Sequence, residues 1–111
     1  MSYGILTMKN EAKKELIWLY GAKCMLTDLA TELNYHHLHK KCDGGKETVE
    51  NGAIISRGPH TWLHKLEESD IQQYRDLNEA LKCYKICLDW NEEQGLKDWE
   101  IVKQQIKNKV R

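Results

Sequence analysis

Several residue types and sequence patterns are scarce in this chain of 111 residues, which has no Phe, a single Pro and no net charge. The 17 basic residues are balanced by 17 acidic ones, which argues against a polycation that coats nucleic acid without specificity. The single Pro leaves helices little interrupted, and Trp and Tyr must supply the aromatic part of the core. No apolar run approaches the roughly 20 residues of a membrane span. We therefore expect no membrane partner.

Signals for export and for a structural zinc are also missing. The first residues lack the basic segment and apolar run of a secretory signal, so we expect a cytoplasmic protein. The four cysteines, Cys24, Cys42, Cys83 and Cys87, form no C-x-x-C pair and are expected to be reduced thiols. Cys83 and Cys87 are four apart in a helical pattern. We expect them to be small buried hydrophobes rather than half of a metal site.

The composition and the hydrophobic patterns predict one α+β domain over residues 1–111. Hydrophobic residues make up 41% of the chain and charged residues 31%, as in globular proteins. In chain order we expect a helix over about 10–20, a strand near 33–37, a loop over 41–51, a strand over 53–56, and helices over about 60–67, 71–88 and 99–110.

Local signals place the ends of these elements. Asn10 is the expected cap of the first helix and Gly21 its end. The Gly58-Pro59 pair is expected to start the short helix over about 60–67. Residues 69–72 match the S-x-x-Q capping box, and Gly95 is expected to end or separate the long helix that follows. The apolar stripe of that helix is Ile71, Tyr74, Leu77, Leu81, Tyr84 and Leu88.

All five histidines lie between positions 36 and 64: His36, His37, His39, His60 and His64. Histidine is the commonest metal ligand and a usual general base near neutral pH. The spacing of His60 and His64 puts both imidazoles on one face of a helix, where they can share a metal ion. His36 and His37 are adjacent in a strand, so they point to opposite faces and must have different roles. We expect His39 to be exposed in the loop.

The order of these residues resembles the HNH endonuclease family. The resemblance is carried by His36-His37, Gly44-Gly45, Glu50-Asn51-Gly52 and the pair His60 and His64, over about residues 22–66. It implies a ββα-metal fold, here flanked by one N-terminal helix and by a C-terminal helical part over about 69–110. It also implies hydrolysis of phosphodiester bonds in DNA. Compact members of the family are frequent in phages and prophages, which is the setting we expect.

The resemblance implies a role for each motif residue. His36, His60 and His64 would bind one divalent ion, with Mg, Mn, Ni or Zn as candidates. His37 would take a proton from the attacking water, and Asn51 would pin the loop and orient His37 or approach the metal. A cation suits this chemistry because a phosphodiester is anionic and repels hydroxide. Basic residues expected to face the phosphates are Lys40, Lys41, Lys46, Arg57 and Lys65.

The chain departs from the family where many members carry two C-x-x-C pairs that bind a structural zinc. Only Cys24 occupies one of these four places, so we expect packing to hold the motif instead. Candidates for that packing are Trp18, Trp62, Trp90 and Trp99.

A different class of function also remains open: an HNH-like binding protein without turnover, such as a phage-encoded inhibitor of a host nuclease or defence complex of the anti-CRISPR type. Zero net charge favours it, and an acidic cluster could meet a basic partner: Glu67, Glu68, Asp70 and Asp76. A toxin-like nuclease with an immunity partner is a third hypothesis. The oligomeric state and the preferred DNA structure stay open.

Overall fold

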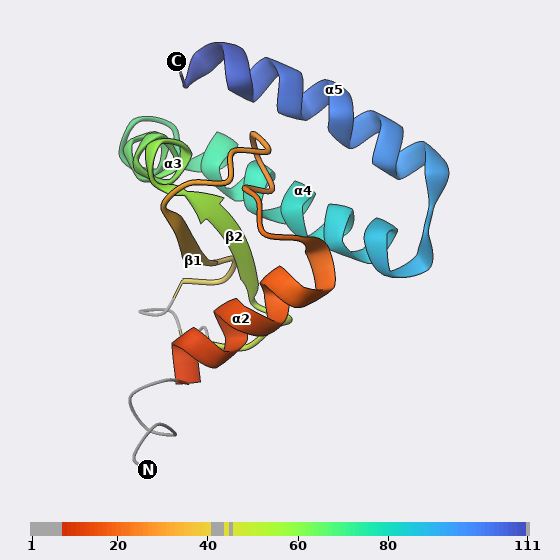
Figure 1. The fold of residues 1–111 in the computed structure, drawn as a ribbon. Helices are drawn as coiled ribbons and strands as arrows, with labels where there is room; N and C mark the ends of the chain where they lie inside the picture. Colours follow the sequence, from red (N-terminus) through yellow and green to blue (C-terminus); the bar gives the residue numbers. More distant parts are fainter. Residues whose placement is uncertain (1–7, 41–43, 45, 111) are drawn as a thin grey trace.

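The computed structural model describes residues 8–40, 44 and 46–110, which form an α+β domain of four helices and a two-stranded sheet (Figure 1). Its elements are α2 (Met8–Tyr20), β1 (Leu33–His37), β2 (Gly52–Ser56), α3 (Arg57–Ser69), α4 (Ile71–Trp90) and α5 (Glu93–Lys109). As predicted, one helix (α2) precedes the two strands, α3 follows them directly, and two further helices (α4 and α5) come after α3. None of the described helices combines the length and the apolar character that crossing a membrane requires.

The two strands pair antiparallel and divide the core into two sides. Tyr35 lies opposite Ile54, and His36 lies opposite Ala53. Because side chains alternate across a strand, Tyr35 and Ile54 face α2 and pack with its Leu16. His36 and Ala53 face the other side, where α3 contacts both strands and α4 contacts α3. The sheet therefore lies between α2 and α3 (Figure 1), while the C-terminal end of α2 reaches α4, where the Tyr20 hydroxyl donates to Asp89 at 2.7 Å.

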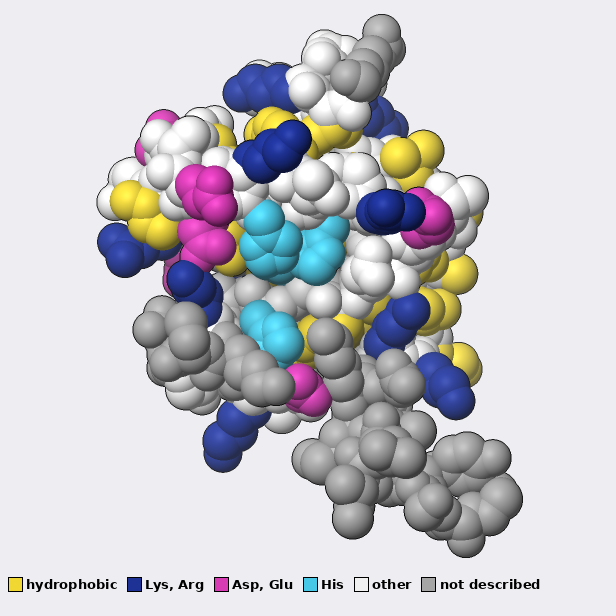
Figure 2. All heavy atoms as spheres, turned by 90° about the vertical axis from the view of Figure 1, so that its left-hand side faces the viewer, with side chains coloured by type: hydrophobic (Ala, Val, Ile, Leu, Met, Phe, Trp, Pro, Cys, Tyr) yellow, Lys and Arg dark blue, Asp and Glu magenta, His cyan; other side chains and the backbone are white. Residues whose placement is uncertain are grey.

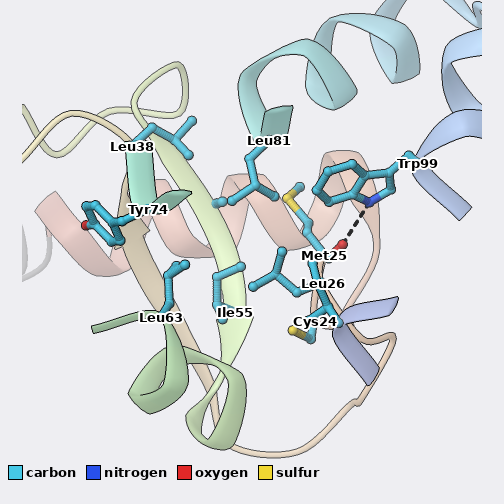
Figure 3. Close-up of a cluster of buried hydrophobic side chains, with 11 residues drawn as sticks. Cys24, Met25, Leu26, Leu38, Ile55, Leu63, Tyr74, Leu81 and Trp99 are labelled. Atoms are coloured by element: carbon cyan, nitrogen blue, oxygen red, sulfur yellow. Dashed lines mark hydrogen bonds between the residues drawn. The ribbon is translucent and has the colours of Figure 1, made fainter. Parts of the chain in front are cut away.

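The larger hydrophobic cluster joins α3, α4 and α5 to the segment before β1 (Figure 3). Its most prominent buried side chains are Cys24, Met25, Leu26, Leu38, Ile55, Leu63, Tyr74, Leu81 and Trp99. The indole Nε1 of Trp99 donates a hydrogen bond to the carbonyl oxygen of Met25 at 2.9 Å. Lys103, also on α5, donates to both carboxylate oxygens of Asp28 at 3.0 and 3.1 Å. Helix α5 thus anchors the segment that precedes β1.

The expectation that four tryptophans hold this region is half wrong. Trp99 is buried and Trp62 packs against the cluster. Trp18 and Trp90, in contrast, are 83% and 81% exposed. Trp18 lies on the outward side of α2, two positions after the buried Leu16, and Trp90 is the last residue of α4. Neither position faces the sheet.

Two of the predicted helix starts are also wrong. Asn10 is the third residue of α2 and not its cap, because the helix already runs from Met8. The N-cap of α4 is Asp70, whose carboxylate accepts from the Gln73 amide at 3.2 Å. Ser69 cannot serve as the cap because α3 continues through it. Gly21, with φ of 100°, ends α2 as predicted.

Helix α4 ends at Asn91, which adopts the left-handed conformation with φ of 51°. Gly95 was expected to end it, but Gly95 lies in the first turn of α5. A Cβ atom at Gly95 would collide with the Cys87 sulfur, so the glycine permits close contact between the two helices. Cys87 is half-buried at this contact and Cys83 is exposed. The expectation that both thiols are buried is therefore wrong.

The buried face of α4 is rotated relative to the predicted stripe. Its buried residues are Tyr74, Asn78, Leu81 and Lys85. Ile71, at the start of the predicted stripe, is exposed. Two polar residues lie at the centre of the face because each bonds to a group on the sheet side: Asn78 to His36 and Lys85 to main-chain carbonyls near β2. This rotation brings α4 into the candidate site.

Candidate metal centre

Three histidines from two elements meet on the α3 side of the sheet. His36 comes from β1, and His60 and His64 come from successive turns of α3. One ring nitrogen of each lies within 4.8 Å of the others, and the Nε2 atoms of His60 and His64 are 3.0 Å apart. Tetrahedral coordination at a zinc–nitrogen distance of about 2.0–2.1 Å places ligand nitrogens roughly 3.3 Å apart. Small side-chain movements would therefore let the three imidazoles share one ion.

The environment of His36 suits a metal ligand. The side chain is buried, with 2% of the residue exposed, and its Nε2 donates to the Oδ1 atom of Asn78 at 2.8 Å. The pKa of His36 is lowered to about 4, mainly by burial, with the hydrogen bond to Asn78 opposing this shift and the neighbouring His60 and His64 adding to it. The imidazole is thus neutral at neutral pH, as metal binding requires. With Nε2 protonated, Nδ1 carries the lone pair.

A carboxylate lies behind His64. The Nδ1 atom of His64 is 3.7 Å from an oxygen of Glu67, which in turn forms an ion pair with Lys40. The hydrogen bond from Lys40 lowers the pKa of Glu67, so this carboxyl group is anionic. A carboxylate on the far nitrogen of a histidine fixes its tautomer and leaves Nε2 for a metal. Glu67 therefore belongs to the edge of this site, although its sequence context suggested a partner-binding cluster.

His37 lies on the opposite face of the sheet from His36, as its place in the strand predicted. Its ring packs edge-on against Tyr35, with the ring centroids 4.9 Å apart. Its Nε2 atom is 3.9 Å from a carboxylate oxygen of Glu47. A histidine next to a carboxylate can accept a proton and hold the resulting positive charge. His37 is therefore separated from the three-histidine group but placed beside an acid.

Asn51 pins the loop between the strands, the first of the two roles predicted for it. Its Oδ1 accepts from the His39 amide at 2.7 Å. Its Nδ2 donates to the carbonyl oxygens of His39 at 3.1 Å and Lys46 at 2.8 Å. The carboxamide is thus committed to main-chain groups at the start and in the middle of the loop. His39 itself is exposed, as expected.

The basic residues expected at phosphates vary in their surroundings. Lys46, Arg57 and Lys65 are exposed, and Lys40 is half-buried in its ion pair. Lys41 lies outside the described residues. Figure 2 shows histidine side chains gathered in the middle of one face, with Lys and Arg side chains and acidic side chains distributed around them. The arrangement leaves cationic groups near the histidines.

Four residues at the site were missed by the sequence analysis: Glu47, Glu67, Asn78 and Lys85. Asn78 and Lys85 did leave a signal. With Tyr74 and Leu81 they form a helical spacing of 4, 3 and 4, so two polar residues interrupt a face that would otherwise be apolar. Glu47 left none, because a loop has no periodicity.

No protein-family model matches the chain, and no curated protein or solved structure does either. The HNH resemblance therefore depends on the motif residues and the geometry around them. Since a fold alone does not imply an activity, the function must be argued from that geometry.

Proposed function

We propose that this protein is a divalent-metal-dependent endonuclease of the HNH type that hydrolyses phosphodiester bonds in DNA. The observation that supports this most strongly is the grouping of His36, His60 and His64 within reach of one ion. The chain order of β1, β2 and α3 matches the order that the HNH resemblance implies for a ββα-metal core. The exposed Lys and Arg side chains on this face suit an anionic substrate (Figure 2).

The three imidazoles would hold one divalent cation and leave positions for water and a phosphate oxygen. A bound cation supplies Lewis-acid chemistry, polarising the phosphate and stabilising the leaving oxygen. An all-imidazole set favours Zn, Ni or Mn, whereas Mg would depend on phosphate oxygens and water to complete its shell. The hydrogen bond to Asn78 keeps His36 in a fixed orientation for this role, and the Glu67 carboxylate lies 3.7 Å from Nδ1 of His64.

His37 is the proposed general base. With Nε2 facing Glu47, Nδ1 is the atom that takes the proton from the attacking water. The carboxylate of Glu47 stabilises the imidazolium that forms. Asn51 keeps the loop closed beside His37 through its bonds to His39 and Lys46.

The test is nicking of supercoiled plasmid with EDTA or with added Mg, Mn, Ni or Zn. We expect metal-dependent nicking that falls by about 10²–10⁴-fold in His37→Ala, the usual contribution of a general base. His39→Ala is the matched control and should retain activity, because His39 is exposed and its bonds to Asn51 use main-chain atoms. A folded wild-type protein that binds metal but nicks with none of these ions would contradict the proposal.

A second candidate is a binding protein that keeps this fold without turnover. The exposed Trp18 and Trp90 favour it, because large aromatic side chains exposed to water are typical of contact surfaces. It predicts an absence of nicking together with a stable complex between this protein and a nuclease or defence complex of the host. Size-exclusion chromatography of the mixture distinguishes this outcome from the enzyme.

A further inference from the structure

One buried ammonium group gathers three main-chain carbonyl oxygens. Lys85 of α4 is 5% exposed. Its Nζ donates to the carbonyl oxygens of Gly52 at 2.7 Å, of Glu50 at 3.2 Å and, at close range, of Val49. An ammonium has three N–H donors, so each one meets an acceptor. The lysine therefore holds the chain segment around the start of β2 through three main-chain oxygen atoms.

The same segment carries two groups of the proposed active site. Residues 46–52 include Asn51, which pins the loop, and Glu47, which faces His37. Most of this segment precedes β2 and has no strand partner for its carbonyl groups, which nevertheless need hydrogen bonds when buried. Besides the bonds from Lys85, the Tyr35 hydroxyl donates to the Thr48 carbonyl at 2.7 Å and Nδ2 of Asn51 donates to the Lys46 carbonyl at 2.8 Å.

We propose that Lys85 is a positioning residue for the hydrolysis proposed above: its ammonium holds residues 46–52 so that Glu47 and Asn51 keep His37 and the loop in place. Lys85 belongs to α4, outside the residues that carry the HNH resemblance. Its three bonds go to main-chain oxygens on both sides of Asn51, so they restrain the backbone rather than a single side chain. The expected effect of Lys85 on activity rests on the proposed function, whereas its expected effect on the order of the loop does not.

A groove of about 620 Å³ between α2 and α4 gives access to this position, because Lys85 lines it together with Leu19, Ile86 and Lys82. Truncation to Lys85→Ala would leave the three carbonyl oxygens facing a space that a small amine can enter. Methylammonium has three N–H donors and can replace the lost group, whereas tetramethylammonium has the same charge and no donor. Lys82→Ala is the matched control, since Lys82 lies on the same helix and groove but is exposed and pairs with Glu79.

The first measurement is plasmid nicking with the metal that supports it best. For Lys85→Ala we expect kcat to fall by about 10²-fold with KM nearly unchanged, the effect of misplacing a catalytic group by about 1 Å. Metal affinity should stay at the wild-type value because the three hydrogen bonds of Lys85 go to main-chain oxygens of residues 49–52 and not to the histidine side chains. Methylammonium should restore most of kcat, tetramethylammonium should restore none, and Lys82→Ala should behave as wild type.

The second measurement is hydrogen exchange of the His39 amide, which donates to Asn51. We expect faster exchange in Lys85→Ala and recovery with methylammonium, whether or not the protein cuts DNA. Absence of nicking by the wild type would therefore overturn only the proposed function. The role of Lys85 is overturned if Lys85→Ala keeps wild-type exchange of this amide. It is also overturned if Lys85→Ala and the isosteric Lys85→Met both unfold as a whole and methylammonium does not refold the alanine variant.

Discussion

Replacement of Asn78 by Leu tests whether α4 controls the metal centre. Asn78 is 4% exposed and His36 is 2% exposed, and their bond measures 2.8 Å. Leu has a similar size but no acceptor. The Nε2–H group of His36 would therefore remain buried without this partner, while the packing of α4 against the sheet is largely kept.

The expected magnitude follows from this burial. A buried donor without a partner costs about 1–3 kcal/mol in the free energy of unfolding. In a domain of roughly 100 residues, each kcal/mol lowers Tm by about 4 °C, so Tm should fall by roughly 4–12 °C. Metal affinity should fall by about 10–100-fold, the usual cost of losing a group that orients a histidine ligand. The reason is that His36 can then rotate or exchange its tautomer.

Isothermal titration with Zn and Ni, beside urea unfolding of the metal-free protein, measures both effects. Asn78→Asp keeps an oxygen acceptor and should keep metal affinity. Glu79→Ala, one position away on the exposed side of α4, should change neither quantity. If Asn78→Leu loses stability but binds metal as tightly as wild type, then Asn78 does not orient His36 for a metal and the reasoning is refuted.

Three further predictions concern the framework. Burial alone would raise the pKa of Asp28, but hydrogen bonds from Lys103 and Lys107 of α5 outweigh burial and lower the pKa. The stability that the ionised Asp28 contributes is therefore present above about pH 4 and is lost as the pH falls through the lowered pKa. The stability gap between wild type and Asp28→Asn, measured in urea, should close at low pH, and a constant gap would contradict this. Trp99→Phe removes the bond to Met25 and should cost about 1–3 kcal/mol in urea unfolding, because it leaves a buried carbonyl unpaired. Gly52→Ala should destabilise the domain and lower its Tm, because the new Cβ would collide with the Tyr35 ring; an unchanged Tm would argue against this contact.

The fold shows where local patterns suffice. The strand and helix order was predicted because alternation and helical spacing are properties of neighbouring residues. The errors occur at helix ends and on helix faces. Ser69 has the right chemistry for a cap, yet α3 continues through it and Asp70 takes that place. A capping pattern does not reveal how far the preceding helix extends.

The sequence by itself determined which histidines could act together. Strand alternation separates His36 from His37, and one helical turn brings His60 beside His64. Only the tertiary structure decided which residues hold the histidines and the neighbouring loop in place. Asn78 meets His36 across 42 positions and Lys85 meets Gly52 across 33. Such contacts depend on how α4 is rotated about its axis, and that rotation is set by the burial of the whole helix face against the sheet rather than by any local pattern.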